Sequence, residues 1–520
     1  MAALATVFHR RDDRFRWRTM PADPEAILDH PLLPFSKNPA DAWTIRNACE
    51  GTQIFGGTGS GKTSGSGRAI ALSFLKNGFG GLVLTAKNEE WPLWERYCQQ
   101  AGRPLSDLIV LDPKGGFQFN FLDYEFNRPD DETDEGKHLT HNIVSLFLAT
   151  LSTGEAAVSN ADPFWNDALR ELLTHAIDLA AIGSGDVHLP DLAAIIRSAP
   201  QSRAEIQSPT WQKKSRCFEL LRAAAARAPA LKKENPGRFN DLEETVAYWL
   251  SDFPNLSEKT RSIIVSSFTG KAAGLLRSPL RRMFCEKVTP ATDRVRPTET
   301  HRGKIIVVNL PVKEYGEVGR FAQMIYKTVW QRATERRRLA GDWRPVFLWA
   351  DESQYFVTAE DMLFQQTARS KMAATVYLTQ NLPNYHAALG TRHGNAATDS
   401  LLGNLQTKIF HANGDPATNE WAERVFARKL QVRPSFSTGI GGHSQPASNA
   451  STNVHQAYEP TVPAIAFTKL QKGGVSPYVV QGIVFSGGRV WKGSDFGEDA
   501  TAVMVSFPQQ PEPAKCSRPN

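Results

Sequence analysis

The chain has 520 residues, 41% of them hydrophobic and 22% charged, which is the ordinary composition of a soluble globular protein with two or three domains. Its formal net charge of +6 comes from local clusters, so it permits binding to nucleic acid without demanding it. No window approaches the roughly 18–20 apolar residues that cross a bilayer, and the segment from His9 to Met20 is too charged for a signal peptide. We therefore expect a cytoplasmic chain with no membrane span of its own.

The cysteines are five in number, widely scattered and without a C-x-x-C pair. This pattern favours reduced thiols and argues against a zinc site. The only metal that we expect is Mg²⁺. The five are Cys49, Cys98, Cys217, Cys285 and Cys516.

A glycine-rich segment at residues 56–63 reads GGTGSGKT and fits the pattern G-x-x-x-x-G-K-[ST]. It follows a short apolar run that ends at Phe55 and precedes a predicted helix over 64–76, which is the order of a phosphate-binding loop. We expect Lys62 to reach the β- and γ-phosphates of a nucleotide, while the Thr63 hydroxyl binds Mg²⁺. The alternative, a glycine-rich turn that matches by accident, does not account for this context. The expected nucleotide-binding residues are Gly56, Gly57, Thr58, Gly59, Ser60, Gly61, Lys62 and Thr63.

Short apolar runs predict an α/β fold whose mostly parallel sheet is assembled from two distant parts of the chain. Between these parts, apolar residues recur at helical spacing, which predicts an all-helical insertion. The predicted strands are 82–84, 108–111, 305–309, 346–350, 375–378 and 408–412, and helices are predicted over 91–100 and 318–339.

These patterns divide the chain into five expected segments. They are an N-terminal extension (1–40), a first segment of the nucleotide-binding domain (41–128), an all-α insertion (129–300), a second segment of the nucleotide-binding domain (301–507) and a disordered tail (508–520). A run rich in Ser, Gly, Asn and Thr predicts a flexible loop over 435–453, and four prolines mark the tail. Neither the loop nor the tail is expected to hold chemistry.

The predicted strand 346–350 ends in two acids, as a Walker B motif does. We expect Asp351 to hold the hydration shell of Mg²⁺ and Glu352 to orient and deprotonate the attacking water. Two adjacent acids could also mark an ordinary strand-end turn. In a chain that also carries a phosphate-binding loop, they favour hydrolysis of ATP over mere binding.

The wide separation of the two motifs by a helical insertion resembles the type IV secretion coupling proteins, which are TraD/TraG-like members of the FtsK–HerA superfamily of hexameric DNA-pumping ATPases. Further similar segments are DPK at 112–114, FNFL at 119–122, DPFW at 162–165 and NLSEKT at 255–260. The similarity continues to about Leu470. It implies a RecA-like P-loop core, ATP and Mg²⁺ as ligands, assembly into a hexameric ring, and movement of single- or double-stranded DNA without sequence specificity. It also implies relaxase or secretion-channel partners and a peripheral place at the inner membrane through a partner.

The resemblance also implies roles for residues beyond the two acids. Gln354 resembles the glutamine of the family's D-E-x-x-Q, and Arg369, in the segment 369–371, is implied to be an arginine finger that reaches a neighbour's nucleotide. The alternative is a surface arginine that pairs with Glu360 or Asp361.

Gln380 follows the predicted strand 375–378, where the family has a "TQ", and is implied to be the nucleotide sensor. The alternative is a strand-end amide satisfied by the backbone.

Two features depart from the family. The strand after the phosphate loop ends in TAKNE at 85–89, so Thr85 stands where the family commonly has an aspartate. Membrane-spanning helices typical of coupling proteins are not found before the phosphate loop.

If the chain forms a ring, DNA is expected to pass through a channel whose basic groups contact phosphates rather than bases. Two basic stretches, at 271–282 and 336–338, are predicted to be helical, and the alternative for each is a solvated charged face. We assign no DNA-contact residue. The basic residues of the first stretch are Lys271, Arg277, Arg281 and Arg282.

Three hypotheses follow from these patterns. The first is a ring-forming, ATP-driven DNA translocase in conjugative transfer, with Lys62, Glu352, Gln380 and Arg369 as its catalytic residues. The second is a soluble HerA-like translocase in DNA processing or phage defence. The third is a docking module that uses ATP to switch shape while its helical domain presents secretion cargo.

Overall fold

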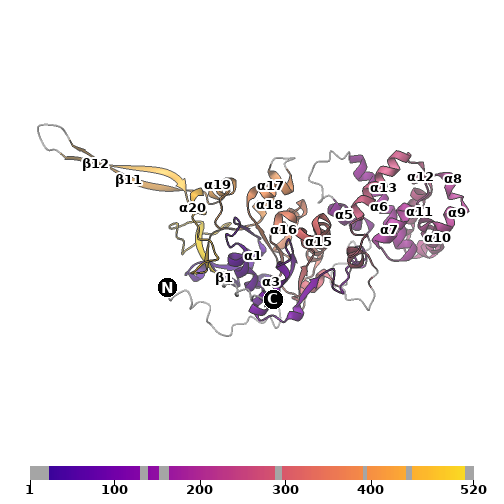
Figure 1. Ribbon diagram of the computed structural model, residues 1–520, viewed down its shortest axis with the longest axis horizontal. Helices are drawn as coiled ribbons and strands as arrows, with labels where there is room; N and C mark the ends of the chain where they lie inside the picture. Colours follow the sequence, from indigo (N-terminus) through magenta and orange to yellow (C-terminus); the bar gives the residue numbers. More distant parts are fainter. Residues whose placement is uncertain are drawn as a thin grey trace, which may run out of the picture.

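The protein, seen in a computed structural model, consists of an α/β body, a helical lobe beside it, and a long two-stranded arm that projects from the side of the body opposite the lobe (Figure 1). The structure describes residues 23–128, 139–151, 163–286, 288, 295–390, 395–440 and 448–509.

The α/β body is built on a sheet that has nine strands among the described residues, in the order β14-β13-β10-β3-β8-β7-β4-β6-β5. The strands from β10 to β5 are parallel, and β13 and β14 extend the sheet in antiparallel pairing. Each predicted strand coincides with one of them, and the sheet joins parts of the chain before and after the lobe. Their bounds are β3 Thr52–Phe55, β4 Gly80–Leu84, β5 Leu108–Leu111, β6 Ile305–Val308, β7 Val346–Ala350, β8 Ala373–Thr379, β10 Thr407–Phe410, β13 Val479–Ser486 and β14 Ala502–Pro508.

The central strands are buried throughout because helices cover both faces of the sheet. Alternate residues of β7 show the two faces: Phe347 stacks on Trp94 of α3 at 5.3 Å between ring centroids, whereas Leu348 belongs to the core on the other face. The first face is covered by α2 (Arg68–Lys76) and α3 (Glu90–Ala101). The second is covered by α15 (Val312–Arg336), α16 (Ala359–Ala368), α17 (Leu382–Leu389) and α18 (Ala396–Asn404).

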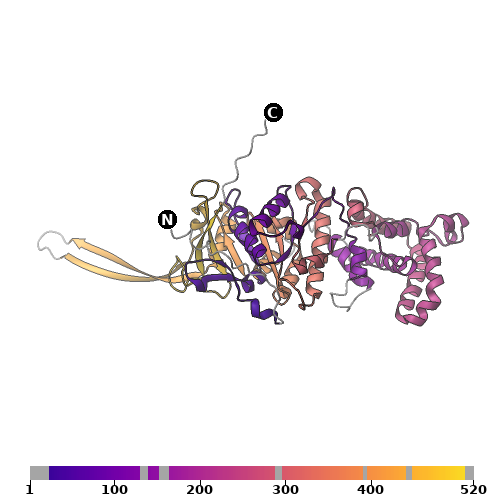
Figure 2. The ribbon, with the colours of Figure 1, turned by 90° about the horizontal axis from the view of Figure 1, so that it is seen from below.

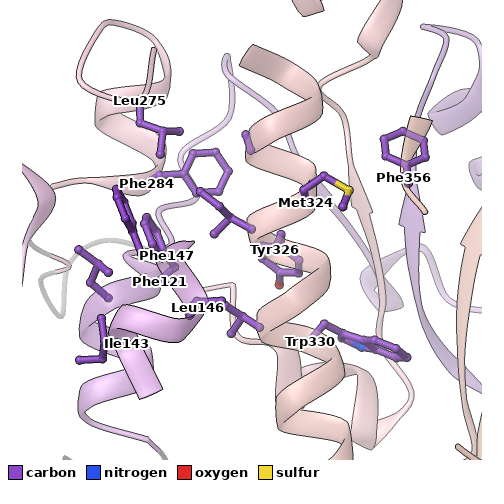
Figure 3. Close-up of a cluster of buried hydrophobic side chains, with 14 of the residues drawn as sticks. Phe121, Ile143, Leu146, Phe147, Leu275, Phe284, Met324, Tyr326, Trp330 and Phe356 are labelled. Atoms are coloured by element: carbon purple, nitrogen blue, oxygen red, sulfur yellow. The ribbon is translucent and has the colours of Figure 1, made fainter. Parts of the chain in front are cut away.

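The helical lobe is continuous with the core on the second face of the sheet. Phe147 and Leu146 of α5, together with Leu275 and Phe284, pack toward Tyr326 of α15 in one apolar cluster (Figure 3). Burial of large side chains across this contact fixes the lobe on the body. The helices of this region are α4 Phe121–Phe126, α5 Thr140–Leu151, α6 Pro163–Ser184, α7 Leu189–Arg197, α8 Arg203–Ile206, α9 Pro209–Lys214, α10 Arg216–Glu234, α11 Pro236–Ala247, α12 Phe253–Asn255, α13 Glu258–Ala272 and α14 Leu280–Phe284.

The arm differs from the flexible loop predicted over 435–453. Strands β11 (Arg428–Ile440) and β12 (Ser448–Pro460) pair in one unbroken antiparallel register and extend away from the body (Figure 2). The prediction read polar composition as a loop, but regular pairing with a second segment satisfies the backbone of a polar strand equally well. The remainder of the predicted loop, 441–447, lies outside the described residues.

The two ends of the chain also differ from the expected segments. Strand β1 (Pro31–Pro34) pairs with β2 (Ala42–Thr44), so the expected boundary after residue 40 falls inside a hairpin. Trp43 of this hairpin is fully buried against Phe74, which makes it part of the body. Pro508, where the tail was expected to begin, is the last residue of β14. Residues 1–22 and 510–520 lie outside the described part of the chain.

No single described helix is both long and apolar enough to span a bilayer, and only the bent pair Asp167–Ser184 and Leu189–Arg197 reaches that length and composition together, with 110° between its halves. The four described cysteines are buried free thiols.

Candidate active site

The predicted motifs lie at the carboxyl ends of four adjacent strands, β3, β8, β7 and β4. Phe55 of β3 is in register with Thr379 of β8, and Ala350 of β7 with Leu84 of β4. Because these strands are parallel, the loops that follow them meet at one edge of the sheet, where open α/β folds bind ligands.

The loop at 56–63 has the backbone shape that phosphate binding requires. Gly59 and Gly61 have φ angles of +72° and +82°, a region that favours glycine. A Cβ at Gly61 would lie only 2.4 Å from a methyl carbon of Val480. The Gly57 amide donates to the carbonyl of Ala412 at 3.0 Å, which ties the loop to the end of β10. The loop is thus compact, but among the described residues no atom beyond the two chain neighbours lies within 4 Å of the position of a Cβ at Gly59. This shape fits the phosphate chain of a nucleotide.

The helix after the loop begins differently from the prediction. Residues Thr63–Gly67 form a π turn, and only from Arg68 does the regular helix α2 run. The wide turn needs small residues, because a Cβ at Gly67 would lie 2.9 Å from the Lys62 carbonyl oxygen. The positive end of the helix still faces the loop.

The buried His411 contacts the π turn that follows the phosphate-binding loop. The His411 Nδ1 lies 2.8 Å from the Gln481 carbonyl oxygen and must donate to it, so Nε2 accepts from the Ser66 hydroxyl at 2.6 Å. Burial lowers the pKa of His411 to about 4, so the ring is neutral. Sequence reasoning missed this contact because the two residues are far apart in the chain and neither belongs to a known motif.

Thr63 and Asp351, the two residues expected to bind Mg²⁺, lie within hydrogen-bond distance of each other. The Thr63 hydroxyl donates to Oδ2 of Asp351 at 2.6 Å, and Asp351 is 6% exposed. A hydroxyl and a carboxylate directed to one point form the oxygen donor set that Mg²⁺ prefers, with water completing its shell. The residues present therefore fit the ion.

Glu352 is surrounded by cations and amide donors. Its side chain is 5% exposed, and its backbone has a left-handed φ of 53°, which is uncommon outside glycine and typical of strained functional sites. The groups that face its carboxylate are Lys62 Nζ at 3.9 Å, Lys87 Nζ at 3.3 Å, Gln354 Nε2 at 3.0 Å and Gln380 Nε2 at 3.2 Å. Burial raises the pKa of Glu352, but these hydrogen bonds and charges together outweigh burial and hold the pKa below its ordinary value. The carboxylate is therefore ionised and able to accept a proton.

Gln380 bridges the phosphate-binding loop and Glu352. Besides donating to Glu352, its amide oxygen accepts from the Thr58 hydroxyl at 3.4 Å. Its backbone carbonyl is held by Asn413 at 2.9 Å. The side chain therefore contacts site residues, whereas the alternative reading had it satisfied by the backbone.

A second buried network joins the strands beneath these residues. The Tyr385 hydroxyl of α17 donates to Gln53 of β3 at 2.7 Å and lies 2.6 Å from the Ser353 hydroxyl. It links the helix after Gln380 to the turn that carries Glu352. Sequence reasoning did not find it, because none of the three residues shows a chemical pattern by itself.

Arg369 lies outside this cluster. It follows α16 and precedes β8, so it lies at the amino ends of the strands, opposite the phosphate-binding loop. Its side chain is 53% exposed and pairs with Glu50 at 3.3 Å, not with either predicted alternative partner. Asp361 is instead buried and bound by Lys327 at 2.7 Å.

Thr85 stands where the family commonly has an aspartate, and its hydrogen bonds are to residues of the core. Its amide donates to Gln323 at 2.7 Å and its hydroxyl to the Val308 carbonyl at 2.8 Å. The turn that follows is closed by the buried Glu90, whose carboxylate accepts from the amides of Ala86 and Lys87 at 3.1 and 3.2 Å. This turn presents Lys87 to the site, a contact that the sequence analysis did not predict.

The two basic stretches differ from the predicted helical faces. Residues 271–282 do not form one helix, since α13 ends at Ala272 and α14 begins at Leu280. In the second stretch, Arg336 pairs with the buried Glu125 at 2.8 Å, and Arg337 is 3% exposed. Arg337 is therefore buried, and Arg336 binds a buried carboxylate while 17% of its side chain stays exposed.

Residues 32–353 match the family described as "Type IV secretory system Conjugative DNA transfer", a span that includes the phosphate-binding loop and both acids. Comparison with curated protein sequences finds no match.

Three similar solved structures are all forms of one coupling protein. The bacterial conjugative coupling protein TrwBdeltaN70, in an unbound monoclinic form, is 14% identical, with a TM-score of 0.57 over 95% of this chain and 92% of that chain. Plasmid coupling protein TrwB in complex with the non-hydrolysable ATP analogue ADPNP is 13% identical, and TrwB in complex with ADP and Mg²⁺ is 14% identical. Both have a TM-score of 0.55 over 95% of this chain and 93% of theirs. The likeness confirms the predicted RecA-like P-loop fold.

Proposed function

This chain belongs to the type IV secretory system family of conjugative DNA transfer proteins, and from that premise we propose that it is an ATP-hydrolysing motor that moves DNA. The observation that carries the proposal is the buried, ionised Glu352 at the edge of the sheet where the phosphate-binding loop and the Thr63–Asp351 pair also lie. A site that only bound nucleotide would not need a buried carboxylate beside the expected γ-phosphate.

The division of labour follows from the geometry. The loop amides and Lys62 bind the phosphates, and Thr63 and Asp351 would hold Mg²⁺, which would neutralise negative charge that develops during the reaction. Glu352 orients a water molecule and takes its proton as the water oxygen bonds to the γ-phosphorus. The bond between that phosphorus and the bridging oxygen breaks, and ADP and inorganic phosphate leave. Gln380 contacts the γ-phosphate from the end of β8.

Assembly into a ring, as a hexamer, completes the proposed site. Arg369 is exposed and lies away from the phosphate-binding loop of its own subunit, so it is available to a neighbouring subunit. An arginine that neutralises charge in the transition state contributes about 10³–10⁵ in rate in related systems. The same proposal places DNA inside the ring. It also includes a relaxase or secretion channel as a partner, which holds the protein at the inner membrane.

The same proposal keeps 41–128 and 301–507 in the nucleotide-binding domain and 129–300 as the insertion, and it extends the nucleotide-binding domain to include the β1–β2 hairpin and Pro508. The single sheet that joins the first and second of these segments supports it.

The experiment that tests the proposal is ATP hydrolysis by the purified protein with and without single- and double-stranded DNA, beside Glu352→Gln, with assembly followed by light scattering. We expect a DNA-stimulated rate that is lost in Glu352→Gln while the analogue ADPNP still binds. A low rate that DNA does not change would contradict the motor and favour an ATP-switched docking module.

A further inference from the structure

Two lysines share one oxygen of Glu352. Oε1 of that carboxylate lies 3.9 Å from Lys62 Nζ and 3.3 Å from Lys87 Nζ. Lys62 belongs to the phosphate-binding loop and is expected to turn to the nucleotide. Lys87 comes from the turn after β4, on the other side of β7, and the proposed function gives it no role.

The surroundings of Lys87 fix its backbone and leave its side chain accessible. The Glu90 carboxylate accepts from the amides of Ala86 and Lys87, which holds the turn in place. The Lys87 side chain is 45% exposed, against 10% for Lys62. A long, partly exposed ammonium on a rigid turn can change partner without any movement of the main chain.

The position of a γ-phosphate follows from the residues already described. It must lie within hydrogen-bond reach of Lys62 and one water molecule away from Glu352, since that water attacks it. A hydrogen bond of about 2.8 Å and an attack distance of about 3.3 Å place the phosphorus roughly 6 Å from the Glu352 carboxylate. The Lys87 ammonium lies 3.3 Å from the same carboxylate, so Glu352 is a neighbour of both groups, and contact of Lys87 with a γ-phosphate oxygen requires its side chain to rotate toward the phosphate.

We propose that Lys87 is a second γ-phosphate-binding cation, supplied by the same subunit and held by Glu352 until ATP arrives. The proposal rests on the proposed function, because it uses the same nucleotide site. A γ-phosphate carries more negative charge than one carboxylate and attracts the ammonium away from it. The transfer frees Glu352 to bind the attacking water, and it favours ATP over ADP, which offers no γ-phosphate to Lys87.

The test measures nucleotide binding without turnover. In a Glu352→Gln background, where the carboxylate partner is already gone, Lys87→Met and Lys87→Arg are titrated with ADPNP and with ADP in the presence of Mg²⁺. Lys214→Met is the matched control, because Lys214 is an exposed lysine on α9 of the helical lobe (Figure 1). Thermal unfolding of each variant reports whether its fold is intact.

We expect Lys87→Met to weaken binding of ADPNP about tenfold, to leave the affinity for ADP unchanged, and to keep the unfolding temperature of its parent. Lys87→Arg should keep most of the preference for ADPNP, because it keeps the charge. Equal affinities of Lys87→Met and Lys214→Met for ADPNP would overturn the proposal, as would a loss of ADP affinity equal to the loss for ADPNP. If the parent protein binds ADPNP through Lys87 but hydrolyses no ATP, the proposed function fails and this inference stands.

Discussion

The neutral His411 beneath the phosphate-binding loop predicts a specific loss of stability in acid. Its pKa is about 4 in the folded protein, whereas an exposed histidine has a pKa of about 6.5. Because the folded value lies below the unfolded one, the unfolded chain takes up the proton first. The contribution of His411 to stability is therefore complete above pH 6.5 and is lost as the pH falls from 6.5 toward 4.

The size of the loss follows from linkage. One pKa unit corresponds to about 1.4 kcal/mol, so at pH 5 the proton taken up by the unfolded chain lowers the free energy of unfolding by about 2 kcal/mol relative to pH 7.5. The variant His411→Gln does not titrate in this range. Other groups titrate in both proteins, and the difference between the two isolates His411.

The assay is denaturant unfolding followed by tryptophan fluorescence, for the parent and His411→Gln at pH 7.5 and pH 5. The parent should lose about 2 kcal/mol more than the variant between the two pH values. Equal losses would refute the reasoning, because they would mean that the His411 ring can be protonated in the folded protein without breaking its contacts to Ser66 and Gln481.

Three further predictions concern charged groups. Asp351→Asn should weaken Mg²⁺-dependent binding of ADPNP about tenfold, measured by titration at rising Mg²⁺; an unchanged Mg²⁺ requirement would exclude Asp351 from the metal site. Arg369→Ala should lower the rate of ATP hydrolysis about 10³-fold in the assembled protein and leave ADPNP binding intact, and a parental rate would remove its assignment as an arginine finger. Arg336→Met should cost about 3 kcal/mol in denaturant unfolding because it removes both hydrogen bonds from the guanidinium to the buried Glu125. Adding Glu125→Gln should recover most of that loss, and no recovery would point to lost packing instead.

The parts of the site that could be predicted from the sequence are those formed by short, contiguous motifs. The phosphate-binding loop and the strand that ends in Asp351 and Glu352 each combine a fixed residue pattern with a defined structural context. The positions of the parallel strands could also be predicted, because a strand buried on both faces is a short continuous run of apolar residues. Neither prediction needed knowledge of which strand lies beside which.

The contacts that could not be predicted depend on which strands lie next to each other in the sheet. Lys87 reaches Glu352 only because β4 lies next to β7, and His411 reaches Ser66 only because β10 lies next to β3. The arm was misread for the same reason, since its polar strands are stabilised by their pairing with each other and not by an apolar pattern. Arg336 likewise looked like part of a solvated face until its buried partner was visible.

The central claim is that ATP hydrolysis at Glu352 moves the protein along DNA, and displacement of a triplex-forming third strand measures that movement directly. With ATP, the parent should displace a labelled third strand from duplex DNA, whereas Glu352→Gln with ATP and the parent with ADPNP should not. A parent that hydrolyses ATP in response to DNA but displaces no strand, or a Glu352→Gln variant that displaces it as fast as the parent, would contradict the account.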